Sequence, residues 1–293
     1  MVVEYMSMKV IPKITCENLS KMYGNQYGIR EVDLDLEFNG LGLLGPNGSG
    51  KTTFIKSLLG LIKPSVGTIH LNIPFEELRV VTDQPNLPGD LSIDEWVRTI
   101  EKIHGGLLRN IDIQTDLGLE GHWKIKNLSA GQKRKAALLP AFYGNPELII
   151  LDEPTNFLDI SSKKYIMKLL KEHIDYTGSN IIIASHNIDE IRTFAKKVLI
   201  LKEGQVMDIV SIDKDRPELY AIQVNKVDDF SNELTQANVH HYIEMTVRGR
   251  IIKVEPTEDL WKVISKFIHE DDGVINSFSA IDKLEYAVEE LTK

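Results

Sequence analysis

The sequence of 293 residues lacks several features by which broad classes of protein are recognised. It holds one cysteine, Cys16, so it can form no internal disulfide and offers no cysteine cluster to a metal ion. Apolar runs such as Leu148–Leu151 fall far short of the roughly 20 residues that a membrane-spanning helix needs. No basic and then apolar leader opens the sequence. We therefore expect a cytosolic chain, which can still dock on a membrane protein.

An excess of positive charge is also missing. The net charge is −9, and residues 207–293 carry 10 basic and 18 acidic side chains, whereas residues 1–206 carry 24 and 25. Proteins that bind nucleic acid present a basic footprint. We therefore expect no nucleic-acid partner, and we interpret the acidic tail as a solvated surface.

Hydrophobic patterning indicates an α/β core. Residues 32–38 alternate apolar and acidic side chains, which is typical of a strand with one face in water. The segments 41–45, 148–153 and 181–186 are continuously apolar and short, as in parallel strands that helices cover on both faces. Apolar residues at helical spacing follow in residues 54–62. Strands that alternate with helices favour the α/β class.

The pattern divides the chain into two domains. Residues 1–206 form the core domain, with a polar, helical insertion at about residues 85–140. Beyond it, strand-like and helix-like stretches restart in residues 207–293, which we expect to form a small α+β domain. That domain has three open interpretations: regulation, stabilisation of a dimer, or docking.

A glycine-rich segment lies between a predicted buried strand and a predicted helix. Gly45, Gly50, Lys51 and Thr52 match the pattern G-x-x-x-x-G-K-[ST] of a phosphate-binding loop. Backbone N–H groups can approach phosphate closely where no Cβ intervenes, and the helix that follows directs its free N–H groups at the anion. The alternative is a plain glycine turn. The phosphate-binding residues that we predict are Gly45, Pro46, Asn47, Gly48, Ser49, Gly50, Lys51, Thr52 and Thr53.

Polar side chains end two other predicted strands. Asp152 and Glu153 follow one buried strand and His186 follows another, so all three should emerge at the edge where such sheets bind ligands. We predict that Thr52 and Asp152 hold Mg²⁺, that Glu153 is the general base for water, and that His186 and Lys51 face the γ-phosphate of ATP. Without the glycine-rich loop, an exposed turn and a structural histidine would explain these residues.

The order of the motifs leads to a family. Residues 128–132, "LSAGQ", resemble the LSGGQ signature of the ATP-binding cassette (ABC) ATPases, and they stand before the acidic strand end, "NFLD" and His186 in that family's order. The resemblance covers roughly residues 13–206. It implies a P-loop NTPase core with an antiparallel β subdomain and a helical insertion, to which the small C-terminal α+β domain is appended.

The resemblance also implies a head-to-tail dimer that sandwiches ATP. Each phosphate-binding loop would receive Ser129, Gly131 and Gln132 from the partner subunit, which is a second copy of the chain or a paralogue. Ala130 departs from the family's usual glycine, which matters only where that position needs a positive φ. Asp159 matches the aspartate that lies across the dimer interface in the family.

Two assignments keep an alternative. The family's adenine-stacking aromatic corresponds to Tyr23, with Tyr27 as the second candidate. The family's glutamine that touches Mg²⁺ corresponds to Gln84 or to its neighbour Asp83, and we favour Gln84. Either side chain offers an oxygen ligand.

The resemblance predicts an ATP-hydrolysing subunit that powers transport through a separate integral-membrane subunit, bound at the cytoplasmic face of the membrane. The closing "LEYAVEELT" loosely resembles the tails of cassettes that serve exporters of drugs, antibiotics or lipids. One alternative is a soluble ABC ATPase in iron–sulfur cofactor assembly or repair. Another is a regulatory module with little turnover, against which Glu153 and His186 argue.

Overall fold

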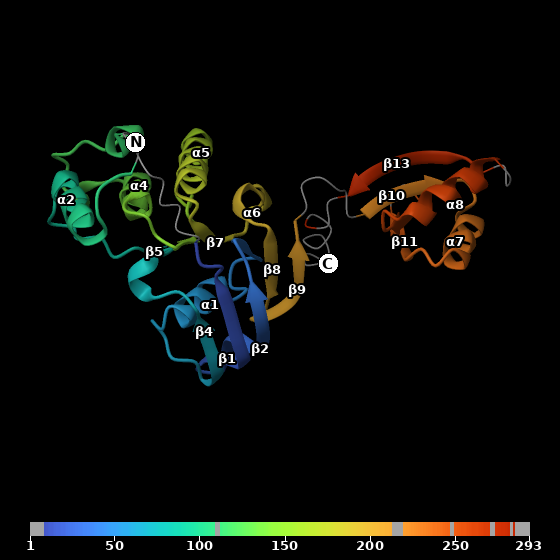
Figure 1. Cartoon of the computed structure of the whole chain (residues 1–293), viewed down its shortest axis with the longest axis horizontal. Coiled ribbons are helices and arrows are strands. Elements are labelled where there is room, and N and C mark those ends of the chain that lie inside the picture. The colour runs from blue at the N-terminus through green and yellow to red at the C-terminus, as the bar shows by residue number, and fades with distance from the viewer. Residues whose placement is uncertain are drawn as a thin grey trace. The chain divides into compact units, whose positions relative to one another are not determined.

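The computed structural model describes residues 9–108, 112–212, 219–246, 249–269, 273–281 and 284. The chain divides into two compact units, Met1–Ser211 and Ile212–Lys293, which are described separately (Figure 1). The first unit extends to Ser211 because the strand that ends there completes a hairpin in its sheet.

A six-stranded sheet forms the centre of the first unit. Its strands lie in the order β5-β6-β7-β3-β8-β9, parallel except for the antiparallel pair β8 and β9. Every residue of β3, β6 and β7 is buried, which explains their continuously apolar sequences. The strands are β3 (Gly40–Leu44), β5 (Leu78–Val81), β6 (Leu148–Asp152), β7 (Asn180–Ser185), β8 (Lys197–Lys202) and β9 (Gln205–Ser211).

Helices cover both faces of this sheet. Leu41 and Leu43 of β3 belong to the same core cluster as α1 (Lys51–Leu58). The alternate residues of β3 face α6 (Ile188–Phe194), so closely that a Cβ on Gly40 would lie 2.2 Å from the carbonyl oxygen of Phe194. Helix α5 (Ile160–Thr177) lies beside α6 on that face (Figure 1). The expected α/β class with a parallel core is confirmed.

A separate antiparallel sheet packs on the α1 side. It consists of β1 (Lys13–Tyr23), β2 (Gln26–Glu37) and β4 (Val66–Leu71), in the order β2-β1-β4. In β2 the apolar residues of the predicted alternation are buried and the acidic ones are exposed. The one-sided strand that the sequence predicts is therefore present, and α1 is enclosed between two sheets.

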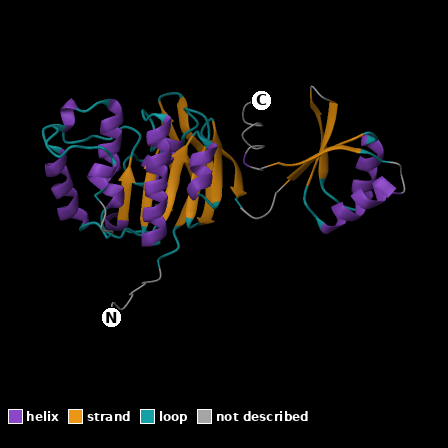
Figure 2. Cartoon of the chain, turned by 90° about the horizontal axis from the view of Figure 1, so that it is seen from above, coloured by secondary structure: helices purple, strands orange, loops and turns teal. Residues whose placement is uncertain are grey.

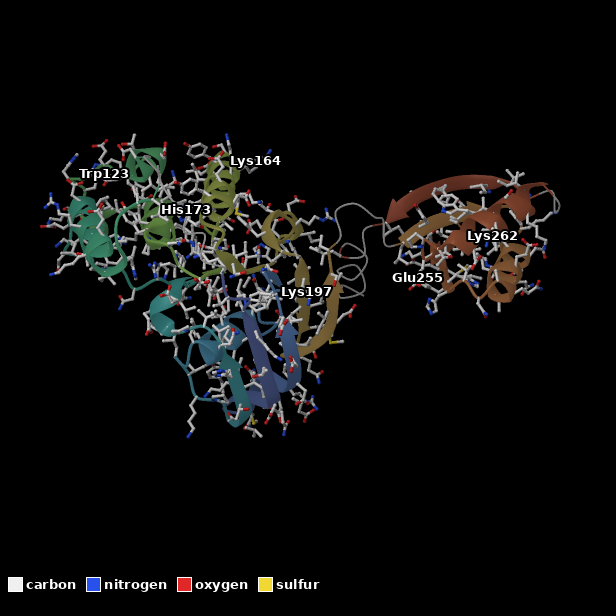
Figure 3. The ribbon with its side chains drawn as sticks, viewed as in Figure 1. Trp123, Lys164, His173, Lys197, Glu255 and Lys262 are labelled. Carbon is white, nitrogen blue, oxygen red and sulfur yellow. The ribbon has the colours of Figure 1, made fainter. Side chains whose placement is uncertain are left out.

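Short helices follow β5, where the sequence predicts the insertion. They are the helices α2 (Ile93–His104), α3 (Ile113–Asp116) and α4 (Ala130–Leu138) and the 3₁₀ turns η2 (Ile125–Asn127) and η3 (Leu139–Phe142), whereas the 3₁₀ turn η1 (Phe75–Glu77) precedes β5. Phe142 contacts the ring of His173 edge-on, at 5.4 Å between ring centroids, which anchors η3 to the core. Figure 3 labels His173 on α5. Among the described residues, no helix combines the length and the hydropathy that crossing a bilayer requires.

The second unit is a four-stranded antiparallel sheet with two helices (Figure 2). The chain order β-α-β-β-α-β and the sheet order β11-β12-β10-β13 define a split β-α-β arrangement. Its core includes Ile222, Phe230, Ile252 and Phe267. The elements are β10 (Leu219–Val224), α7 (Val227–Gln236), β11 (His241–Thr246), β12 (Gly249–Val254), α8 (Glu258–His269) and β13 (Ile275–Ile281). The segment "LEYAVEELT" lies, apart from Leu284, outside the described residues.

Candidate functional site

The glycine-rich loop connects β3 to α1 at the carboxyl edge of the parallel sheet. Gly48 has φ 82° and Gly50 has φ 105°, both in the left-handed region that favours glycine. At Gly50 a Cβ would also lie 2.3 Å from the carbonyl oxygen of Gly28. Glycine is therefore required by the fold at Gly50, and the loop presents its backbone at the start of α1, where anions bind.

Four side chains from two segments meet at this edge. The Thr52 hydroxyl donates to Asp152 Oδ2 at 2.8 Å, which joins α1 to the end of β6. Lys51 donates to the carbonyl oxygens of Gly45 at 2.7 Å and Pro46 at 3.2 Å, and its Nζ lies 3.4 Å from Glu153 Oε1. Lys51 is 5% exposed, so its charge acts in a largely dry environment.

Glu153 and His186 are in direct contact. His186 Nδ1 lies 2.9 Å from Glu153 Oε2, and the Glu153 side chain is almost fully buried while that of His186 is half exposed. Glu153 has φ 48°, a conformation that is uncommon for any residue other than glycine and that clusters at functional sites. The structure therefore brings the acidic strand end and the histidine together with Lys51.

The chemistry of the acidic cluster suits a divalent cation. Burial raises the pKa of Asp152, and the negative charges of Asp83 and Glu153 raise it further, opposed by the Thr52 hydrogen bond and by Lys51. Among the described residues, Asp152 Oδ1 and Glu153 Oε1 are buried without a hydrogen-bond partner. A hydroxyl and carboxylates are the hard oxygen ligands that Mg²⁺ prefers, so these residues fit the ion.

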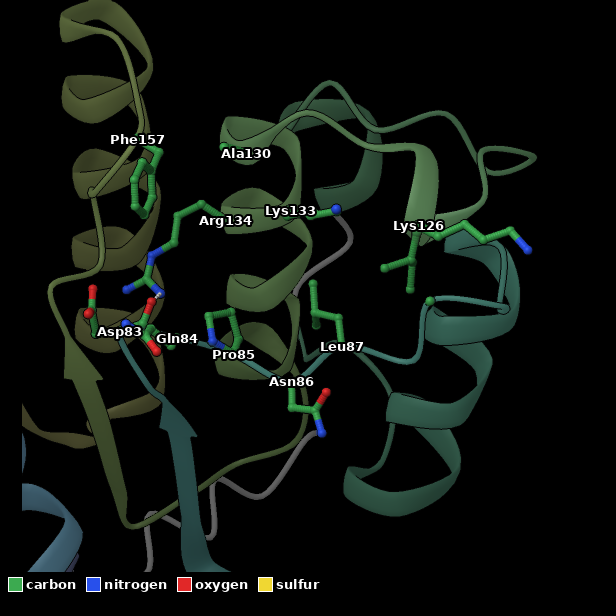
Figure 4. Close-up of a pocket in the computed structure, with 12 residues that line it drawn as sticks. Asp83, Gln84, Pro85, Asn86, Leu87, Lys126, Ala130, Lys133, Arg134 and Phe157 are labelled. Carbon is green, nitrogen blue, oxygen red and sulfur yellow. Dashed lines mark hydrogen bonds between the residues drawn. The ribbon is translucent and has the colours of Figure 1, made fainter.

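Asp83 and Gln84 have different surroundings. Asp83 Oδ1 accepts a hydrogen bond from Asn156 Nδ2 at 2.8 Å, just beyond the acidic strand end, and its charge acts on Asp152. Gln84 is exposed and lines a pocket of about 460 Å³ next to the insertion (Figure 4). The other residues of the pocket are Asp83, Pro85, Asn86, Leu87, Gly89, Ile125, Lys126, Ala130, Lys133, Arg134 and Phe157.

The signature segment opens α4. Ser129 is the N-cap: its Oγ accepts from the backbone N–H of Gln132 at 3.2 Å, and Gln132 Oε1 accepts from the N–H of Ser129 at 2.9 Å. This capping box leaves Ser129 and Gln132 exposed to solvent or intermediate in burial, at a helix N-terminus. Ala130 is helical and is not among the residues with positive φ, so it replaces glycine without strain.

Gly131 lies against the "NFLD" segment, since a Cβ there would be 3.1 Å from the carbonyl oxygen of Phe157. Asp159 caps α5 by accepting from the N–H of Ser162 at 2.9 Å. Hydrogen bonds from Ser161 and Ser162 lower the pKa of the Asp159 carboxyl. Asp159 is exposed, at the start of a helix rather than beside Lys51.

The two candidate aromatics are both half exposed. Tyr23 is the one beside the phosphate-binding loop, because a Cβ on Gly28 would meet both Tyr23 Cε2 and the Thr53 side chain, at 2.8 and 2.9 Å. Arg30 lies over the ring of Tyr27, 5.4 Å from its centroid. The surroundings of Tyr23 suit a base that extends from the loop.

Sequence reasoning missed two buried charges behind the site. Arg134 extends from α4 toward the carbonyl groups at the strand ends, and Glu190 accepts from the hydroxyls of Thr155 and, at 2.9 Å, Ser185. Glu190 thereby connects the segment after Glu153 to the segment before His186. Neither residue belongs to a short motif with a known mechanism, and a basic run such as "KRK" normally indicates a solvated surface.

Comparison with known proteins agrees with this geometry. The profile of the family described as "ABC transporter" matches residues 30–156. The bacitracin transport ATP-binding protein BcrA of Bacillus licheniformis is 33% identical over 220 residues, which are 70% of this chain and 71% of BcrA. The phosphonates import ATP-binding protein PhnC 1 of Synechococcus sp. (strain JA-2-3B'a(2-13)) is 32% identical over 225 residues, 66% of this chain and 86% of PhnC 1.

Solved structures share the fold. The dimeric structure of MJ0796, described as a bacterial ABC transporter cassette, superposes with a TM-score of 0.58 at 24% identity and covers 68% of this chain and 99% of its own. The relatives named here are transporter proteins and lend no support to the iron–sulfur alternative. The chain therefore belongs to the family of ABC transporter ATP-binding proteins, and it is an enzyme that binds and hydrolyses ATP.

Proposed function

We propose that this chain is the ATP-hydrolysing subunit of an export-type ABC transporter and drives a separate integral-membrane subunit from the cytoplasmic face of the membrane. The observation that carries the proposal is the convergence of Lys51, Thr52, Asp152, Glu153 and His186 at one edge of the sheet. These residues supply a phosphate clamp, metal ligands and a proton acceptor within one site.

The loop and its flanking residues hold the triphosphate. Gly45–Thr53 present backbone N–H groups to the phosphates, and Lys51 exchanges its carbonyl partners for phosphate oxygens, which are stronger acceptors. Tyr23 stacks on the adenine. Thr52 and Asp152 would hold Mg²⁺, with Asp83 rather than Gln84 as the further oxygen ligand, because the hydrogen bond from Asn156 holds Asp83 beside the acidic strand end. An ion held there would supply positive charge to the phosphate oxygens.

Glu153 and His186 act on the attacking water. The Glu153 carboxylate accepts the proton of the water, and His186, in contact with Glu153 Oε2, orients that carboxylate and faces the γ-phosphate. The ammonium group of Lys51 lies 3.4 Å from the other carboxylate oxygen of Glu153, so it can reach the phosphate and the base from the same position. Glu153 contributes the proton transfer, and the positioned positive charges stabilise the transition state of phosphoryl transfer.

A second subunit completes the site. In a head-to-tail dimer, Ser129, Gly131 and Gln132 of one subunit bring the N-terminus of α4 to the γ-phosphate held by the other. The exposed Phe157, Asp159 and Ile160 lie on the segment that would cross the interface. ATP then closes the dimer and hydrolysis opens it.

The pocket beside the insertion is the docking site for the membrane subunit. Pro85, Leu87 and Ile125 give it apolar walls, and Lys126 and Lys133 give it a basic rim (Figure 4). An amphipathic helix of the membrane subunit with an acidic residue matches that lining. Asp83 and Gln84 lie in the same wall, so docking is coupled to the metal site.

The proposed direction of transport is supported by the likeness to BcrA, a bacitracin transport ATP-binding protein. The second unit is an accessory domain that contributes none of the proposed site residues. Export is tested in inverted membrane vesicles that carry the transporter. An exporter accumulates its cargo inside these vesicles when ATP is added outside, whereas an importer empties preloaded vesicles.

Hydrolysis is tested with Glu153→Gln. Removing the base should lower kcat by about 10²–10⁴-fold, while ATP binding persists and the ATP-bound dimer becomes more stable. The matched control is Glu120→Gln, an exposed residue of the insertion, which should hydrolyse ATP like the parent chain. Hydrolysis at the parent rate by the Glu153 variant would show that another group is the base.

The transporter assignment is tested by recovery of the chain from cells. We expect it in the membrane fraction, in a complex with an integral-membrane protein that detergent, but not high salt, releases intact. Recovery only in soluble complexes that carry iron–sulfur assembly proteins would contradict the transporter proposal and leave the ATPase assignment standing.

A further inference from the structure

Arg134 is a buried cation whose hydrogen-bond partners are all main-chain carbonyl groups. Its side chain is 2% exposed and extends from the middle of α4 (Figure 4). Its hydrogen bonds run from Nε to Pro154 O at 2.9 Å, from Nη1 to Thr82 O at 2.6 Å and Asp83 O at 3.3 Å, and from Nη2 to Asp152 O and Glu153 O at 2.6 Å each.

These carbonyl groups belong to two segments that are far apart in the sequence. Thr82 and Asp83 begin the segment that lines the pocket, and residues 152–154 end the strand that carries the metal ligand and the base. A planar guanidinium with five N–H donors can bind both segments at once, which lysine cannot. Burial lowers the pKa of Arg134, and nearby carboxylates, Asp83 first, oppose that shift and keep it charged.

The contact to Glu153 fixes an uncommon backbone conformation. Glu153 has φ 48°, its N–H donates to Ala184 O at 2.8 Å, and its C=O accepts from Arg134 at 2.6 Å. Both backbone polar groups of Glu153 are therefore held: the N–H by the strand that leads to His186, and the C=O by Arg134 of α4 and by the N–H of Asn156 at 3.2 Å. Such a conformation persists where the surroundings hold it, and it determines the direction in which the side chain points.

We propose that Arg134 is a positioning residue for hydrolysis, which ties the helix that begins at Ser129 to the backbone of Asp152 and Glu153. The inference rests on the proposed function and adds a way in which the rate of ATP hydrolysis is regulated. The direction in which the Glu153 carboxylate points depends on the position of α4. A shift of α4 therefore changes the rate of hydrolysis. Such a shift can occur when the dimer closes or when the membrane subunit fills the pocket. Arg134 acts through Glu153 and does not itself touch the nucleotide.

The chain contains a matched control. Arg79 is also buried and also donates to main-chain carbonyl groups, those of Tyr143 at 3.1 Å and Leu78 at 2.9 Å among them. Its partners lie in η1, β5 and α2 and at the end of η3, and none of them is Asp152 or Glu153. Loss of a buried guanidinium should therefore destabilise the fold in both Arg79→Lys and Arg134→Lys, but only the second variant should alter the geometry of the base.

The experiment compares the full chain with the two variants by thermal unfolding, by fluorescent ADP binding and by steady-state ATP hydrolysis per folded molecule. We expect similar losses in melting temperature and unchanged ADP affinity for both. We expect kcat to fall about 10²-fold in Arg134→Lys alone, as for a misplacement of about 1 Å at a reacting group. Equal kcat in the two variants would overturn the inference, whereas failure of the proposed function would appear in the unmodified chain as an absence of hydrolysis.

A second measurement needs no variant. Hydrogen exchange on the unmodified chain, with and without a non-hydrolysable magnesium nucleotide, should show residues 82–86, 130–138 and 153–158 gaining protection together, because Arg134 joins them. Protection of residues 153–158 while α4 and residues 82–86 stay unchanged would contradict the inference, even if no Arg134 variant folds.

Discussion

Asp83 and Gln84 are neighbours in the chain, but only Asp83 is held beside the acidic strand end, through Asn156. Asp83→Asn keeps an acceptor for that hydrogen bond and removes the charge. We expect it to weaken Mn²⁺ binding to the ADP-bound chain by roughly 10–100-fold, the usual cost of altering a group that supports a metal site. Electron paramagnetic resonance measures free Mn²⁺ directly. Gln84→Ala is the matched control, and a larger loss there than in Asp83→Asn would restore Gln84 as the ligand.

The negative charge of Asp152 should lower the stability of the metal-free fold, although the same charge is needed to bind the metal ion. Its raised pKa means that the folded chain holds the proton more tightly than the unfolded chain does. The stabilisation from this group is therefore complete below the ordinary pKa of 3.8 and is lost as the pH rises through the raised value. At neutral pH without metal, Asp152→Asn should raise the melting temperature, by roughly 2–4 °C for each kcal/mol of relieved repulsion.

Calorimetry in EDTA checks this expectation. The stability advantage of Asp152→Asn should shrink as the pH falls toward 4, because Asp152 of the parent chain becomes protonated there. The same variant should fail to bind Mg²⁺ with nucleotide. A lower melting temperature than the parent at neutral pH would show that the charge of Asp152 is stabilised by its neighbours, chiefly Thr52 and Lys51.

The residues of the site differ in how far sequence predicts them. Lys51, Thr52 and Asp152 follow from local patterns, because a glycine-rich loop and a strand end place them irrespective of the rest of the fold. Arg134 does not, since its role arises from carbonyl groups that lie 18 to 52 positions away in the chain. The sequence does not decide between Asp83 and Gln84 either, because neighbours in an irregular segment can point in different directions.

Helix α4 begins with a capping box, and so does α2, where Ser92 accepts from the N–H of Glu95 at 3.2 Å. The two caps are equivalent in local structure but not in our proposal. Ser129→Ala and Ser92→Ala should each cost about 0.5–2 kcal/mol of stability, the range for an N-cap serine. Only Ser129→Ala should also weaken the ATP-bound dimer, because only Ser129 meets the nucleotide of the partner subunit.

Analytical ultracentrifugation in the Glu153→Gln background measures the dissociation constant of that dimer, because hydrolysis no longer causes the dimer to dissociate. Unfolding in urea gives the two stabilities for comparison. Equal dimer affinity in both variants would show that the hydroxyl of Ser129 serves the helix alone, and that the contact across the interface is made by backbone N–H groups.

Secondary structure can be predicted from the sequence for strands that are buried on both faces or on one face only. The strands β3, β6 and β7 are buried on both faces and the strand β2 on one, and each has the matching sequence pattern. Apolar residue type is a less reliable guide on α8, where Trp261 is half exposed although Leu260 and Phe267 are fully buried. Trp261 packs edge-on against Tyr220, at 5.7 Å between ring centroids, so its position serves an aromatic contact at the border of the core.

The two units of the molecule have independent hydrophobic cores. One core joins the two sheets and α1 of the first unit, and the other joins the sheet of the second unit to α7 and α8. All of the proposed site residues belong to the first core's unit. The whole chain should therefore unfold in two transitions rather than one, because each unit can lose its core while the other remains packed.

A chain that ends at Ser211 should fold and hydrolyse ATP. It retains β9, whose hairpin with β8 closes the edge of the central sheet, and every residue that binds nucleotide or metal in the proposal. Its melting temperature should equal that of one of the two transitions of the whole chain, and its kcat should match that of the whole chain. Loss of hydrolysis in this folded, shortened chain would show instead that the acidic second unit takes part in closing the ATP-bound dimer.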